Sequence, residues 1–156
     1  GILHNCVNEG NIETSEPCDD IGGLIGRSSG VDLFGCTNRG TIKGACSRSA
    51  SGLIGVVSWS DKNRTYTIDG CVSEGDILLS GNVASDASKG AVVQVSGLLG
   101  IYYTTSVPYH ITNCRVSCRI QADNANINLL WGGYNGGKVD LFEADDHTKK
   151  NSEILQ

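Results

Sequence analysis

The seven cysteines have the most versatile chemistry in this chain, because a thiolate can bind a metal, attack a substrate or form a disulfide. Four of them occupy one place in a repeated phrase, and each is followed six residues later by isoleucine. The pairs are Cys6 and Ile12, Cys36 and Ile42, Cys71 and Ile77, and Cys114 and Ile120. Equivalent residues of a repeat protein stack on one another, so we expect a buried ladder of thiols beside a ladder of isoleucines.

The other three cysteines are Cys18, Cys46 and Cys118. Cys18 and Cys46 each follow a ladder cysteine at a similar distance, so they are the one pair for which we consider a disulfide. Cys114 and Cys118 have a spacing that occurs in zinc sites, but no second pair of Cys or His residues completes four ligands. The sequence therefore predicts neither a metal nor a cofactor.

Side chains suited to catalysis are present but are not grouped along the sequence. The three histidines are far apart, the serines lie in no nucleophile-elbow pattern, and the paired aspartates at 19–20 and 145–146 belong to no calcium-loop motif. We therefore predict that the chain is not an enzyme. The alternative is a fragment of an extracellular carbohydrate-active enzyme, or an accessory domain of a secreted protease.

Aromatic residues gather in two insertions between the repeated phrases. They are Trp59, Tyr66, Tyr102, Tyr103 and Tyr109. Insertions at the same point of successive repeats emerge on one face, and aromatic rings offer a large contact area at a small entropic cost. We predict a platform that contacts a sugar or a protein. The alternative is that the rings pack on the flank of the repeats as a satellite core.

Glycine-bearing phrases must position these side chains. The phrase Gly-Leu-apolar-Gly occurs at residues 23–26, 52–55 and 97–100, and Asn or Gly precedes each ladder cysteine. Asn or Gly at a fixed place marks left-handed backbone, which makes a corner. Between corners we expect about three short strands per repeat and no helix, since no period of 3.6 residues is present. Leu24, Leu53 and Leu98 are expected to form a third internal column.

The pattern predicts an all-β fold: a short parallel β-helix-like solenoid of about four rungs with a degenerate C-terminal cap. A β-trefoil or other closed antiparallel barrel is the alternative, with hairpins such as 56–59 against 65–68. We expect a single β-repeat domain over residues 1–142, with repeats at about 1–20, 21–49, 50–94 and 95–126 and a cap at 127–142. Residues 80–94 read as a mobile loop, and residues 143–156 as a polar tail or a short helix.

Composition limits the partners of the chain. It has 156 residues, a formal net charge of −5, and 39% hydrophobic and 19% charged residues, as folded domains do. Its Lys and Arg residues are scattered, so they do not form the basic surface that a nucleic acid needs. No apolar run is long enough for a transmembrane segment. The chain opens in the middle of a repeat phrase, so we expect a longer precursor with neighbouring domains.

The Gly-Leu-apolar-Gly phrase, the cysteine corner and the following Asn-x-Gly-x-Ile phrase together resemble the GLUG motif of bacterial surface proteins. The resemblance covers residues 23–43, 52–78 and 97–121, with a half match at 2–13. Val116 and Cys118 depart from it, because they stand where the motif has Asn and Gly. The resemblance implies a parallel β-helix or related solenoid in a secreted or surface-anchored protein, often adhesin-like or part of an extracellular protease. The motif has no catalytic residues to carry over.

The predicted function is therefore that of a non-catalytic structural or adhesive repeat module of a bacterial surface or secreted protein. Its predicted location is extracellular or at the cell surface. Its predicted partner is a glycan or a protein, which the aromatic face would contact.

Overall fold

The computed structural model of the chain describes residues 1–58, 63–101, 108–134 and 142–156. In these residues the structure is all-β and every strand pair is parallel. The predicted all-β class and the parallel arrangement of strands are confirmed. The alternative closed antiparallel barrel is wrong, because β10 (Ile54–Val57) and β11 (Tyr66–Asp69), the expected hairpin, belong to different sheets.

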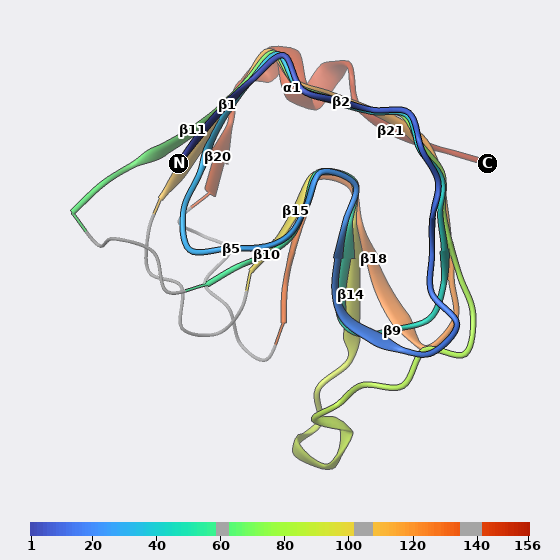
Figure 1. The fold of residues 1–156 in the computed structure, drawn as a ribbon. Helices are drawn as coiled ribbons and strands as arrows, with labels where there is room; N and C mark the ends of the chain where they lie inside the picture. Colours follow the sequence, from blue (N-terminus) through green and yellow to red (C-terminus); the bar gives the residue numbers. More distant parts are fainter. Residues whose placement is uncertain (59–62, 102–107, 135–141) are drawn as a thin grey trace.

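The strands stack into four sheets, which line successive sides of each circuit of the chain (Figure 1). The first sheet has the order β1 (Ile2–His4), β6 (Asp32–Phe34), β11, β16 (Tyr109–Thr112), β20 (Phe142–Ala144). The second has the order β2 (Val7–Asn8), β7 (Thr37–Asn38), β12 (Val72–Ser73), β17 (Arg115–Ala122), β13 (Ile77–Leu79), β8 (Ile42–Gly44), β3 (Ile12–Glu13). A further strand, β21 (Glu153–Leu155), pairs with β17. The third contains β4 (Cys18–Gly22), β9 (Cys46–Ser51), β14 (Val93–Ser96) and β18 (Ala125–Asn128). The fourth contains β5 (Ile25–Ser28), β10, β15 (Leu99–Ile101) and β19 (Trp131–Gly133).

The chain visits the sheets in the same order on each circuit, and we call one circuit a coil. Coil 1 is β1–β5, coil 2 is β6–β10, coil 3 is β11–β15 and coil 4 is β16–β19. Figure 1 looks along the stack and shows the coils overlying one another over most of their path. Coils 1 to 3 have five strands each instead of the expected three. Two-residue strands such as β2, β7 and β12 are too short for their pattern to separate them from turns.

Each coil bends sharply between its first and second strands. The residue at this corner has a positive φ, which is 53° at Asn5, 62° at Gly35, 64° at Gly70 and 52° at Asn113. Glycine adopts this conformation freely, and asparagine tolerates it better than most residues do. The predicted corner before each ladder cysteine is confirmed.

Columns of equivalent side chains from successive coils fill the interior. Ile42 is in register with Ile12 on one side and Ile77 on the other, and Ile77 is in register with Ile120. Parallel strands lie about 4.8 Å apart, so these side chains are in contact along the stack. Ile42 and Ile77 are fully buried, because a coil covers them on both sides.

In coils 1 to 3 the Gly-Leu-apolar-Gly phrase makes the inward bend that divides the coil into two lobes (Figure 1). Its first glycine packs against the opposite wall of the stack, where it meets residues of the next coil. A Cβ atom on Gly52 would overlap the Ser73 hydroxyl and the Gly97 carbonyl, and one on Gly97 would meet Val116. Glycine is required here because no side chain fits between the two walls.

The leucine that follows this glycine turns into the core. The N–H of Leu24 donates to the carbonyl of Leu53 at 3.0 Å, and that of Leu53 donates to Leu98 at 2.9 Å. Leu53 and Leu98 are fully buried, whereas Leu24 in coil 1 is only half-buried. The three leucines therefore lie in adjacent coils at one place in the circuit.

Residues 142–155 close one end of the first two sheets. The short helix α1 (Asp146–Lys150) places the Oγ1 of Thr148 3.0 Å from the backbone nitrogen of Cys114, and Thr148 is fully buried. Two further side chains accept from amides of the last coil: Asp145 from Asn113 at 3.1 Å and Ser152 from Val116 at 3.0 Å. Side-chain oxygens thus satisfy backbone donors where a further coil would otherwise pair.

Part of the expected cap, residues 127–133, continues the stack: β18 and β19 pair in regular register with β14 and β15. They are the last strands of the third and fourth sheets. Residues 143–156 contain the short helix that was one of the two alternatives, α1, and β20, α1 and β21 pack on β16 and β17. No helix in the described residues has the length and apolar character needed to cross a membrane.

Candidate functional site

Tyr66 and Tyr109, two of the five aromatic residues of the predicted platform, lie inside the molecule. Their rings stack with centroids 5.3 Å apart, and the Tyr109 ring lies 5.2 Å from that of Phe142. The Tyr109 hydroxyl accepts a hydrogen bond from the N–H of Val31 at 3.3 Å. Tyr109 is fully buried and Tyr66 is 5% exposed. Burial raises the pKa of the Tyr109 phenol, so this group is neutral at ordinary pH.

The predicted platform must be corrected for these two rings, because they cannot meet a ligand in this position. The sequence signal for this burial is the alternation of side chains along a β-strand. Tyr66 stands two residues before Ile68, and Tyr109 two before Ile111. Each ring therefore lies on the same inward face of its strand as a buried isoleucine. Three further platform residues, Trp59, Tyr102 and Tyr103, lie outside the described residues.

The ladder cysteines meet through hydrogen bonds. The N–H of Cys36 lies 3.4 Å from the Sγ of Cys71, and the N–H of Cys71 lies 3.4 Å from the Sγ of Cys114. The thiol of Cys114 also donates to the carbonyl of Thr112 at 3.2 Å. All seven cysteines are free thiols, and the described residues contain no group of three or more Cys, His, Asp or Glu that could hold a metal. The sulfur atoms of the ladder cysteines therefore form hydrogen bonds with backbone groups at the corners of the stack.

We expect the buried thiols to resist labelling in the folded protein. Burial raises the pKa of Cys46 to about 12 and that of Cys118 to about 11, so both are protonated near neutral pH. A thiol reagent at mildly alkaline pH should modify the exposed Cys18 quickly and the half-buried Cys6 slowly. Five thiols should react only after unfolding: Cys36, Cys46, Cys71, Cys114 and Cys118. Rapid labelling of Cys36 or Cys71 in the folded protein would contradict the buried ladder.

Cys18 and Cys46, the pair considered for a disulfide, are register partners on β4 and β9. Both are free thiols, Cys18 exposed and Cys46 buried. The Sγ of Cys46 lies 3.7 Å from the carbonyl oxygen of Asp19, to which it donates. In this structure the pair is therefore aligned by strand register but forms no disulfide.

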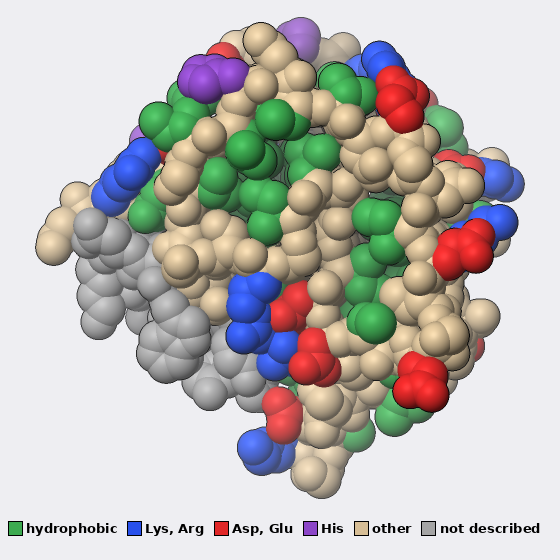
Figure 2. All heavy atoms as spheres, in the orientation of Figure 1, with side chains coloured by type: hydrophobic (Ala, Val, Ile, Leu, Met, Phe, Trp, Pro, Cys, Tyr) green, Lys and Arg blue, Asp and Glu red, His purple; other side chains and the backbone are tan. Residues whose placement is uncertain are grey.

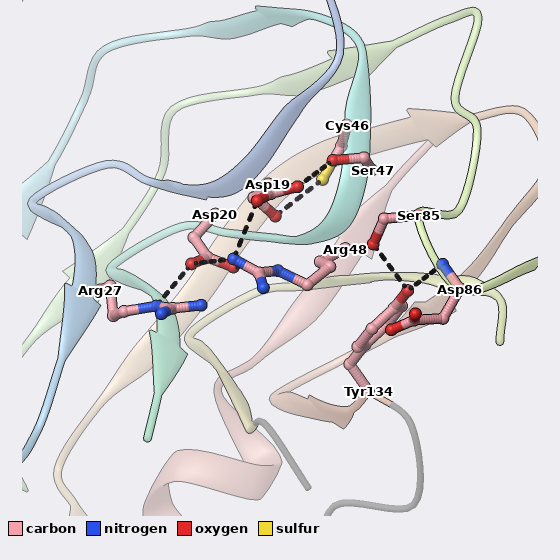
Figure 3. Close-up of polar contacts among 9 residues, drawn as sticks. All are labelled: Asp19, Asp20, Arg27, Cys46, Ser47, Arg48, Ser85, Asp86 and Tyr134. Carbon is pink, nitrogen blue, oxygen red and sulfur yellow. Dashed lines mark hydrogen bonds and ion pairs between the residues drawn. The ribbon is translucent and has the colours of Figure 1, made fainter. Parts of the chain in front are cut away.

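An ion-pair network covers the outer surface where β4, β5 and β9 meet (Figure 3). Asp20 accepts from Nε of Arg27 at 2.7 Å and from Nη2 of Arg48 at 2.8 Å. Asp19 accepts from the Ser47 hydroxyl at 2.6 Å and lies 3.2 Å from the same Arg48 nitrogen. The two carboxylates together compensate Arg48, whose side chain is only 15% exposed. Charge-assisted bonds occupy these oxygens, so the arrangement holds coils 1 and 2 together.

Removal of Asp20 is expected to destabilise the fold by about 1–3 kcal/mol in an Asp20→Ala variant, because Arg48, whose side chain is largely buried, loses a charged partner. Arg27 adds little, since its side chain is 43% exposed. Urea denaturation measures the change. Glu16→Ala, which removes an exposed carboxylate from the same coil, is the control and should cost less than about 0.5 kcal/mol. Equal stability of the two variants would contradict a structural role for the network.

The segment between β13 and β14 stands away from the stack (Figure 1). A groove lies along this segment. Its volume is about 490 Å³, and small apolar side chains and two amides line it: Asn82, Val83, Ala84, Ala87, Ala91, Val92, Asn124 and Ala125. Val83 and Val92 are 64% and 41% exposed. The lining contains no ionisable side chain, so the groove offers apolar contact and amide hydrogen bonds rather than acid–base chemistry.

The same segment differs from the mobile loop expected at 80–94. It contains a short 3₁₀ helix, η1 (Ala87–Lys89). The buried side chain of Asn82 accepts from the N–H of Cys46 at 2.7 Å, and the N–H of Asn82 donates to Asp123 at 3.0 Å. The hydroxyl of Tyr134 accepts from the N–H of Asp86 at 3.3 Å (Figure 3). These contacts are made by residues that do not recur in the repeats, so no sequence pattern predicted them.

Comparisons with known proteins leave the family open. No family model matches the chain, so the resemblance to the GLUG motif stays a prediction. No solved structure matches it either. Halomucin from Haloquadratum walsbyi is similar to this chain, with 33% identity over 94 residues, or 58% of the chain. The chain spans about 1% of the length of halomucin.

Proposed function

We propose that the chain is a non-catalytic structural and adhesive module of a surface or secreted protein, built as a short parallel β-helix of about four rungs with a C-terminal cap. One observation carries the proposal: the residues that recur along the sequence are used in stacking one coil on the next. The ladder thiols bond to backbone amides, and the isoleucines contact one another. The partial similarity to halomucin gives loose support to a surface or secreted setting.

The adhesive part of the proposal rests on the two aromatic insertions. Val57 pairs with Ile101, so the residues that precede the two insertions lie in adjacent coils. In this proposal Trp59, Tyr102 and Tyr103 contact a glycan or a protein, as exposed aromatic residues do at many interfaces.

A double variant tests this contact. Trp59→Ala combined with Tyr103→Ala is expected to keep the melting temperature of the parent and to lose binding to immobilised glycans or to cell-surface protein. Tyr109→Ala is the comparison, and it should destabilise the fold by about 3–5 kcal/mol because its ring is fully buried. A large fall in melting temperature for the double variant would show that the rings belong to the core, and the adhesive role would be dropped.

The non-catalytic part is tested separately. Incubation with acidic and neutral polysaccharides and with unfolded protein is expected to release no product. Product release that Asp19→Asn or Asp20→Asn abolishes would contradict the proposal, because those carboxylates are the ones that lie close to each other around Arg48.

A further inference from the structure

Two cysteines lie opposite each other on adjacent coils, where two strands of the third sheet begin. Cys18 is the first residue of β4 in coil 1, Cys46 is the first residue of β9 in coil 2, and the two are register partners. Neighbouring strands of a sheet lie about 4.8 Å apart, and disulfides join Cα atoms that are about 4.4–6.8 Å apart. The backbone therefore holds this pair at a separation that a disulfide can span.

The side chain of Cys46 points toward coil 1. Its Sγ lies 3.7 Å from the carbonyl oxygen of Asp19, the residue that follows Cys18 (Figure 3). The register of the two strands shifts between Cys18 and Asp20, so the regular ladder of hydrogen bonds is interrupted next to Cys18. The Cys46 sulfur thus lies beside the segment that carries Cys18.

The two thiols differ in how a reagent can reach them. Cys18 is exposed and its thiol has no hydrogen-bond partner among the described residues, whereas Cys46 is buried. Cys6, the other accessible thiol of coil 1, is half-buried and donates to the carbonyl of His4 at 3.6 Å. Figure 2 looks onto coil 1 and shows acidic and basic side chains side by side, so no surface of a single charge repels a charged reagent. A reagent from solution should therefore meet Cys18 first.

We propose that Cys18 and Cys46 are a disulfide site, which a low-molecular-weight disulfide oxidises in the folded protein. The bridge joins coil 1 to coil 2 close to the Asp20 network, which already holds these two coils together through an ion pair with Arg48. The fold stays the same, because both residues keep their places in the strands. The inference goes beyond the proposed function, since it concerns the covalent state of the module and not what it adheres to.

The reaction has two exchange steps. In the first, the thiolate of Cys18 attacks one sulfur of the reagent, whose S–S bond breaks and releases a small thiolate that takes up a proton. In the second, Cys46 gives its proton to solvent and attacks the sulfur of Cys18, and a second small thiol leaves. The protein loses two hydrogen atoms, and the reagent is reduced to two thiols. Burial, and to a smaller extent the nearby Asp20 carboxylate and Cys18 thiol, raise the pKa of Cys46 to about 12, so the second step is the slower one.

The probe is glutathione disulfide, added in excess to the full chain at mildly alkaline pH. After the remaining thiols are blocked, digestion after Arg, Lys and Glu places the four cysteines of coils 1 and 2 in separate peptides. Mass spectrometry without reduction should show peptide 14–27 joined to peptide 44–48. We expect the bridged protein to melt roughly 5–10 °C above the reduced protein, because the bridge restricts the unfolded chain between the two cysteines.

Cys18→Ser and Cys6→Ser are the matched variants. Each removes one accessible thiol of coil 1, and neither residue is fully buried, so both variants should fold. Cys18→Ser should abolish the bridge and the rise in melting temperature, and Cys6→Ser should keep both. The proposal is overturned if the glutathione adduct of Cys18 remains the end product, if the bridge joins another pair, if bridging does not raise the melting temperature, or if the two variants behave alike. None of these outcomes depends on the aromatic insertions, so they are distinct from failure of the adhesive role.

Discussion

Gly52→Ala is expected to lower the free energy of unfolding by about 3 kcal/mol or more, which corresponds to a fall in melting temperature of roughly 6–12 °C for a domain of this size. The added methyl group would overlap the Ser73 hydroxyl and the carbonyl of Gly97. Neither obstacle can withdraw easily, because Ser73 is fully buried and the Gly97 carbonyl is backbone of the adjacent coil. The opposite walls of the stack, contributed by coils 2 and 3, must therefore separate at the inward bend.

Gly10→Ala is the matched control for this variant. The nearest atom to a Cβ at Gly10 is Oδ1 of Asn8 at 3.6 Å, which is an ordinary contact. We expect its melting temperature to stay within about 2 °C of the parent, because exposed sites without strain tolerate such changes. A Gly52→Ala protein as stable as Gly10→Ala would show that the two walls are not in close contact.

Leu53→Ala is expected to destabilise the protein by about 2–5 kcal/mol, the usual range for a cavity in a packed core. Leu53 is fully buried between Leu24 and Leu98, and coils on both sides limit how far the cavity can collapse. Urea denaturation at neutral pH measures the loss. The value should lie near the upper end of the range if the stack is rigid.

Leu24→Ala provides a graded comparison within the same column. Leu24 is half-buried because coil 1 is covered on one side only, so its truncation should cost about half as much as that of Leu53. Val83→Ala, at a side chain that is 64% exposed, should have little effect. Equal losses at Leu24 and Leu53 would contradict the position of coil 1 at an open end.

The stacking of the coils was predictable from the sequence, because identical residues recur at fixed distances from one another. Ile42 and Ile77 occupy one offset from their cysteines, and the structure has them in register. The corners were predictable for a different reason: the positive φ at Gly35 and Asn113 admits few residue types, so it leaves a mark on the sequence.

The features that escaped prediction depend on contacts between residues that do not repeat. Thr148 follows the cysteine column in space and accepts from the N–H of Cys114, but it lies in a helix that has no counterpart in the described residues of the earlier coils. The Asp20 network joins residues of three strands, and only the register of β4 with β9 brings Arg48 to it. The burial of Tyr66 could have been predicted from its spacing to Ile68, but its place in an insertion favoured a surface position.

Contacts between isoleucine side chains test the account most directly, because it rests on the stacking of equivalent residues in the interior. In protein labelled at the isoleucine methyl groups, a nuclear Overhauser experiment should connect Ile42 with both Ile12 and Ile77, and Ile77 with Ile120. It should not connect Ile12 with Ile77, which lie two coils apart at about twice the 4.8 Å strand spacing. A spectrum without the contact between Ile42 and Ile77, or with Ile12 close to Ile120, would contradict the stacked coils.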